Sequence, residues 1–126
     1  MLHSVAKTGA MVELQAAAMF LQAGYEVFVN AAPSGPADLV VWNPDTNETV
    51  LIDVKTCRGH APKLHNPTNL HYWSVAPIKP NVQLLHYAPD LNLYYWHPEQ
   101  PVPECLQQLG ITSTKPETRC IDYGNE

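Results

Sequence analysis

Asp53 and Lys55 are the residues whose surroundings most strongly suggest chemistry. They lie in an apolar segment, residues 50–55 (VLIDVK), that has the character of a buried strand. Side chains alternate along a strand, so Asp53 and Lys55 share one face, with Cα atoms about 6.6 Å apart. A structural ion pair would account for them, but burial of such a pair rarely offsets its desolvation. A functional site is the more common reason to retain one.

Glu13 is a second acid in an apolar setting. Residues 8–24 predict a helix, with Thr8 as the N-cap and Gly24 as the stop. At about 100° per residue, Glu13 falls on the same face as Ala17 and Phe20. A carboxylate there is costly without a partner, although stabilisation by the helix dipole near the N-terminal turn is an alternative explanation.

Asp38 follows a turn with two prolines and a glycine, and it opens the apolar segment 37–43 (ADLVVWN). Aspartate is common at turns, so its position alone is weak evidence of function.

The remaining elements indicate one α/β (α+β) domain spanning residues 1–126, with a central mixed sheet of four to five strands flanked by helices. Strands are expected at 25–30, 37–43 and 48–56, and a hairpin at 82–87 and 91–96. Residues 57–72 predict a long loop, residues 103–109 a short helix, and residues from about 111 onward an irregular tail.

Composition favours a soluble intracellular protein. The chain has 126 residues, three widely spaced cysteines and no CxxC pair. Neither a signal peptide nor an apolar stretch long enough to cross a membrane is recognisable, so a cytoplasmic location is expected.

The charge is unevenly distributed along the sequence. The net charge of −5 argues against a nucleic-acid partner. However, residues 54–89 contain no Asp or Glu and hold four Lys or Arg and four His. This acid-free segment predicts a local positive patch on an otherwise acidic chain.

Taken together, Glu13, Asp38 and the Asp53-Val54-Lys55 tripeptide resemble the PD-(D/E)xK nuclease superfamily. The resembling stretch is residues 8–56, and the hairpin that follows is similar to the last two core strands of such nucleases. The likeness is strongest to small phage or bacterial members of the superfamily, such as homing endonucleases and junction resolvases. One departure is Ala37, which separates Pro36 from Asp38 where the family name has the two adjacent.

The resemblance implies a restriction-endonuclease-like core and Mg²⁺-dependent hydrolysis of DNA phosphodiesters, with Mn²⁺ as a possible substitute. Asp38, Asp53 and the Val54 backbone carbonyl would bind the metal, and Glu13 would complete the cluster directly or through water. Lys55 would orient or activate the attacking water. Small members commonly act as homodimers, so a homodimer is expected.

The expected loop offers two further hypotheses. Residues Arg58, His60, Lys63 and His65 follow Lys55 closely and are expected to contact DNA phosphates. The alternative is a zinc site, but the spacing of Cys57, His60, His65 and His71 matches no usual zinc pattern.

Two other interpretations remain open. The chain could be a catalytically silent nuclease-fold module that binds DNA or a protein, which the acidic balance favours. It could also be an unrelated α/β domain, but then Glu13 and Asp53 would be buried without partners. The sequence does not decide between nicking, site-specific cutting and resolution of branched DNA.

Overall fold

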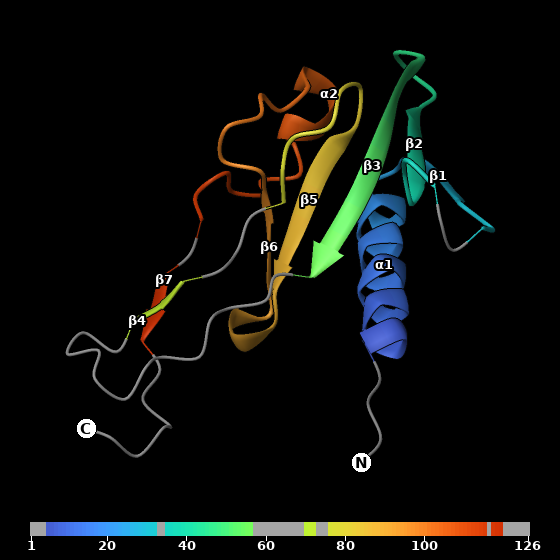
Figure 1. The fold of residues 1–126 in the computed structure, drawn as a ribbon. Helices are drawn as coiled ribbons and strands as arrows, with labels where there is room; N and C mark the ends of the chain where they lie inside the picture. Colours follow the sequence, from blue (N-terminus) through green and yellow to red (C-terminus); the bar gives the residue numbers. More distant parts are fainter. Residues whose placement is uncertain (1–4, 33–34, 57–69, 73–75, 116, 120–126) are drawn as a thin grey trace.

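A computed structural model describes residues 5–32, 35–56, 70–72, 76–115 and 117–119 (Figure 1). In chain order the elements are α1 (Val5–Gln22), β1 (Glu26–Val29), β2 (Leu39–Asn43), β3 (Glu48–Thr56), β4 (Leu70–Tyr72), β5 (Gln83–Ala88), the 3-10 turn η1 (Pro89–Leu91), β6 (Leu93–Trp96), α2 (Glu104–Gln107) and β7 (Glu117–Arg119).

The main sheet has five strands in the order β1-β2-β3-β5-β6. The β3–β5 pair is parallel and the other pairs are antiparallel, so the sheet is mixed. The predicted sheet of four to five strands is confirmed, with β3 at its centre. Figure 1 shows α1 running alongside the β3 half of this sheet.

Helix α1 buries the face that the sequence predicts. Ala17 and Phe20 are buried and join a core with Ile52 and Val54 of β3. Gly24 has a φ of 97°, a left-handed conformation that suits glycine and ends the helix as predicted. The predicted N-cap, Thr8, is wrong because the helix already begins at Val5. Ala6 and Lys7 are good helix formers, and they extend the helix by one turn.

Strand β3 shows the predicted alternation. Its bounds, 48–56, are those expected from the sequence. Ile52 and Val54 point into the core beneath α1, so Asp53 and Lys55 lie on the opposite face of the sheet. Asp53 is nonetheless only 3% exposed, and Lys79 of the segment before β5 reaches over that face to contact it.

The hairpin β5–β6 is confirmed, with η1 as its turn. Tyr95 and Trp96 are both fully buried although they point to opposite faces, so both faces of β6 are covered. Tyr94 is half-buried, and its hydroxyl donates to the Val12 carbonyl at 2.7 Å, which ties β6 to α1.

The sequence predicted two irregular segments, and both predictions are partly wrong. Residues 70–72 of the expected loop form β4, and residues 117–119 of the expected tail form β7. The two strands pair antiparallel as a separate sheet. Each has only three residues and its partner lies more than 40 positions away, so neither carries a recognisable local pattern. The rest of the expected loop, 57–69, lies outside the described residues.

Candidate functional site

Asp53 forms an ion pair with each of two lysines. Its Oδ2 atom lies 2.5 Å from the Nζ of Lys79 and 3.7 Å from the Nζ of Lys55. The Asp53 side chain is 4% exposed, whereas those of Lys79 and Lys55 are 38% and 46% exposed. The carboxylate is therefore buried, but the two ammonium groups that neutralise it reach toward solvent.

Asp38 lies immediately before β2, at the edge of β3. Its backbone N–H donates to the Ile52 carbonyl at 2.9 Å, which continues the β2–β3 pairing. Its carboxylate Oδ2 then accepts the backbone N–H of Val54 at 2.8 Å. Asp38 thus satisfies a β3 amide at the point where the β2 ladder ends, and this hydrogen bond fixes its carboxylate beside β3.

The carboxyl groups of Asp38 and Asp53 are close enough to share a hydrogen bond. Burial first, and then this bond with Asp53, raise the pKa of Asp38 to about 6, although the Val54 N–H opposes the rise. Asp38 therefore retains its proton at pH values where an isolated aspartate has lost it.

Glu13 interacts electrostatically with Asp53 and Lys55. Burial, and secondly the negative charge of Asp53, raise the pKa of Glu13, while the charge of Lys55 lowers it. Glu13 and Asp38 also line one cleft of about 400 Å³, together with residues from the start of α1 and from the β1–β2 connection (Gly9, Ala10, Asn30, Ala31 and Ala32). The four residues singled out in the sequence are thus brought together at the end of β3.

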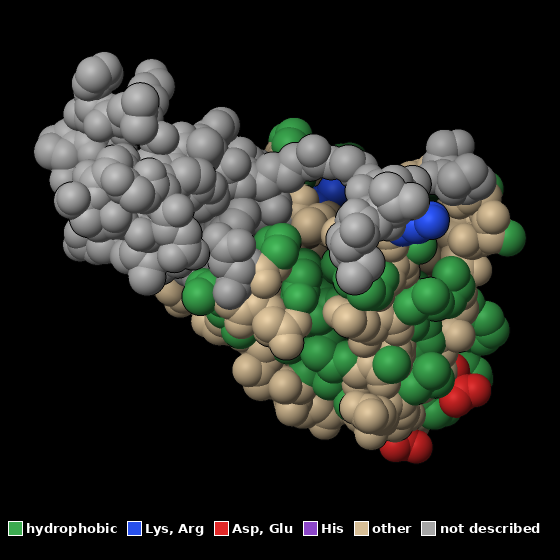
Figure 2. All heavy atoms as spheres, turned by 90° about the horizontal axis from the view of Figure 1, so that it is seen from below, with side chains coloured by type: hydrophobic (Ala, Val, Ile, Leu, Met, Phe, Trp, Pro, Cys, Tyr) green, Lys and Arg blue, Asp and Glu red, His purple; other side chains and the backbone are tan. Residues whose placement is uncertain are grey.

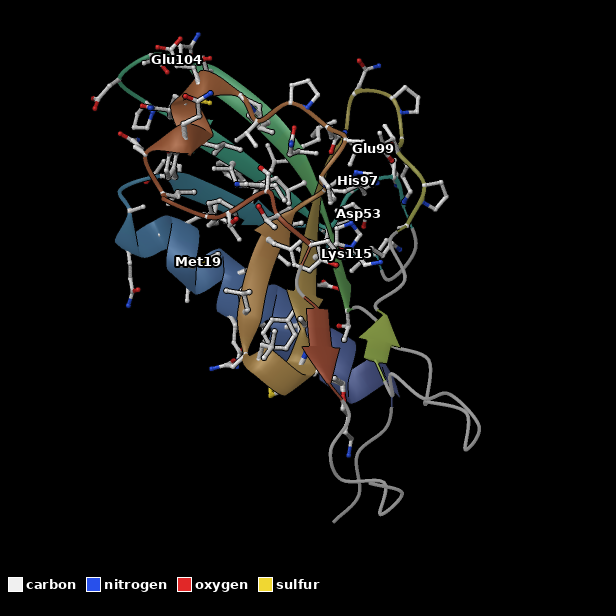
Figure 3. All side chains as sticks on the ribbon, turned by 90° about the vertical axis from the view of Figure 1, so that its left-hand side faces the viewer. Met19, Asp53, His97, Glu99, Glu104 and Lys115 are labelled. Atoms are coloured by element: carbon white, nitrogen blue, oxygen red, sulfur yellow. The ribbon has the colours of Figure 1, made fainter. Side chains whose placement is uncertain are left out.

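Two polar side chains, the buried His97 and the half-buried Gln100, hold the segment that carries Lys79. His97 accepts the Glu99 N–H on Nδ1 at 3.1 Å and faces the Ala76 carbonyl with Nε2 at 3.0 Å, so Nε2 must carry the proton. Gln100 donates to the Val82 carbonyl at 2.7 Å. The 76–82 segment is therefore fixed near both ends, and Figure 3 shows His97 and Asp53 in the same part of the molecule.

His86 lies on the same face of the sheet as Asp53. Its ring stacks on Tyr95, with a centroid separation of 5.2 Å, and its Nε2 has no hydrogen-bond partner among the described residues. Burial, and secondly the charge of His97, lower the pKa of His86 to about 4. His86 is therefore neutral near pH 7.

Lys79 is the site residue that sequence reasoning missed. It lies in the acid-free segment but 26 positions from Asp53, outside any motif. Conversely, the expected DNA contacts at Arg58, His60, Lys63 and His65 lie outside the described residues, as do Cys57 and the His71 side chain of the alternative zinc site. Within the described part of the chain, no three His, Cys, Asp or Glu residues are arranged to hold a metal.

The raised pKa of Asp38 predicts a pH-dependent stability in the metal-free protein. Folding raises the pKa of Asp38 from 3.8 to about 6. A carboxyl with such a raised pKa contributes to the stability of the fold at pH values below 3.8, and this contribution is lost as the pH rises through about 6. Asp38→Asn keeps an acceptor for the Val54 N–H but does not titrate. We expect wild type to lose about 1–3 kcal/mol relative to Asp38→Asn between pH 4 and 7.

Thermal melts of both proteins in EDTA, at several pH values, measure this difference. The lowered pKa of His86 has the opposite effect, because it costs stability as the pH falls from 6.5 toward about 4. Both proteins contain His86, so this effect cancels in the difference between their stabilities. Parallel stability curves for the two proteins would contradict the assignment.

Comparisons with known proteins connect this fold to a nuclease. No protein-family model and no curated protein matches the chain. Among solved structures it is similar to a bacterial homing endonuclease, with a TM-score of 0.58 over 99% of this chain and 82% of that chain, at 16% sequence identity. The similarity supports a nuclease fold, whereas membership of the PD-(D/E)xK superfamily stays a prediction.

Proposed function

We propose that the protein is a divalent-metal-dependent DNA endonuclease of the PD-(D/E)xK type. The observation that carries the proposal is the close approach of the Asp38 and Asp53 carboxyls, with Glu13 and Lys55 beside them at the end of β3. A homing endonuclease that shares the fold supports the same conclusion.

The donor chemistry of the site fits Mg²⁺. This ion usually binds through one or two carboxylates and keeps several water ligands. Asp38 and Asp53 would supply those carboxylates, and the Val54 carbonyl would be a further ligand. Since no group of three acids in the described chain is arranged around one point, Glu13 is assigned a contact through water. The bound metal would neutralise phosphate charge and lower the pKa of a water molecule.

Lys55 is positioned to act on substrate. Its side chain is about half exposed and lies 3.7 Å from Asp53, beyond a strong hydrogen bond. Its ammonium group is therefore free to hold the attacking water or a phosphate oxygen.

The charge pattern agrees with DNA binding at this end of the molecule. Figure 2 views the end at which β3 terminates; Lys and Arg side chains are visible in the upper part of the described surface, and acidic side chains at its lower right edge. Together with Arg58, His60, Lys63 and His65, these cations would contact the DNA backbone. A homodimer would supply one active site for each strand. The described residues include no helix long and apolar enough to span a bilayer.

Incubation of wild type with supercoiled plasmid, single-stranded, flapped and four-way DNA tests the proposal. We expect cleavage of at least one substrate with Mg²⁺ or Mn²⁺ and none in EDTA. Binding of DNA without cleavage under every metal condition would instead support the catalytically silent module.

A further inference from the structure

Lys79 makes the closest charged contact of the site. Its Nζ lies 2.5 Å from the same Asp53 oxygen that is 3.7 Å from Lys55. In the metal-free protein, Asp53 is therefore neutralised mainly by a lysine from outside the sequence motif. The contact occupies an oxygen that the proposed function assigns to the metal.

The backbone around Lys79 is held in place on both sides, which positions Lys79 for its contact with Asp53. Pro77 and Pro80 flank Ile78 and Lys79 and restrict the backbone. His97 holds Ala76 and Gln100 holds Val82, as described above. The Lys79 side chain, in contrast, is 38% exposed and has room to turn toward solvent.

We propose that Lys79 neutralises Asp53 while no cation is bound, leaves Asp53 when a divalent cation binds, and then contacts a backbone phosphate of DNA. This inference rests on the proposed nuclease function. Its physical basis is charge: a divalent cation on Asp53 replaces the ammonium group and repels it. A lysine on a fixed backbone at the edge of a metal site then meets the phosphate that the metal attracts.

Mn²⁺ affinity without DNA is the first measurement. The full-length protein is titrated with Mn²⁺, and free ion is followed by electron paramagnetic resonance. Lys79→Met should bind Mn²⁺ at least about fivefold more tightly than wild type, the effect expected for removal of one unit charge beside the ion. Lys79→Arg, which keeps the charge, and Ile78→Ala, which alters the same segment at an exposed position, should bind as wild type does.

DNA affinity is the second measurement, made with saturating Mn²⁺ in the Lys55→Met background, in which little cleavage is expected. Lys79→Met should bind a fluorescent duplex less tightly, and the slope of log K against log salt should fall by about 1, as for loss of one phosphate contact. Lys79→Arg should restore the slope. A variant that had merely lost its fold would bind both the metal and the DNA less tightly.

The outcomes separate this inference from the proposed function. If wild type binds Mn²⁺ and cleaves DNA, but Lys79→Met shows unchanged or weaker Mn²⁺ affinity or an unchanged salt slope, only the role of Lys79 is refuted. If wild type neither binds Mn²⁺ nor cleaves DNA, the nuclease proposal and this inference are both refuted.

Discussion

Replacing Lys55 by methionine should lower the single-turnover rate of DNA cleavage by about 10²–10³-fold, the usual effect of removing one group that stabilises the transition state. The fold should survive, because Asp53 keeps its closer partner Lys79. Mn²⁺ binding should also survive, since Lys55 supplies no ligand to the metal. If the proposed mechanism holds, loss of Lys55 slows the chemical step without weakening metal binding.

Quenched-flow or gel assays at saturating enzyme measure this rate. Lys115→Met is the matched control, because it removes the same charge from a half-buried lysine that is in neither Asp53 ion pair. Equal rates for wild type and Lys55→Met would remove Lys55 from the mechanism. Equal losses in both variants would show that only overall charge matters.

Asp53→Asn should abolish detectable cleavage, a loss larger than that for Lys55→Met. The substitution preserves the shape of the buried side chain but removes a proposed metal ligand and leaves Lys55 and Lys79 without their shared anion. Metal affinity and chemistry are then lost together, whereas Lys55→Met loses only chemistry.

Isothermal titration with Mn²⁺ beside the cleavage assay distinguishes the two variants. Asp45→Asn is the control for loss of a carboxylate, because Asp45 is an exposed residue in the turn between β2 and β3. Wild-type Mn²⁺ affinity in Asp53→Asn would show that the metal binds elsewhere.

Local sequence patterns predicted the central part of the fold and most of the candidate site. The bounds of β3 and the shared face of Asp53 and Lys55 follow from strand alternation within one segment. The inward face of Glu13 follows from helical periodicity in the same way. These features depend on neighbours in sequence, which a single chain displays directly.

What the sequence did not predict depends on contacts between distant segments. The hydrogen bond from the Val54 N–H to Asp38 arises only because Asp38, one residue before the start of β2, continues the pairing with β3. Lys79 reaches Asp53 because β5 lies parallel to β3, which brings the segment before β5 over that face of the sheet. Neither the Val54–Asp38 hydrogen bond nor the Lys79–Asp53 ion pair leaves a recognisable pattern in the local sequence.

The central claim, that Asp38 and Asp53 hold the catalytic metal, is tested most directly by locating Mn²⁺ in crystals through its anomalous scattering. The proposal predicts a peak in contact with both carboxylates, at about 2.0–2.6 Å from their oxygens, the range of Mg²⁺ and Ca²⁺ ligands. In the same crystals, the Lys79 ammonium group should have moved away from Asp53. A peak at any other place, with Asp38 and Asp53 still sharing a hydrogen bond, would contradict it.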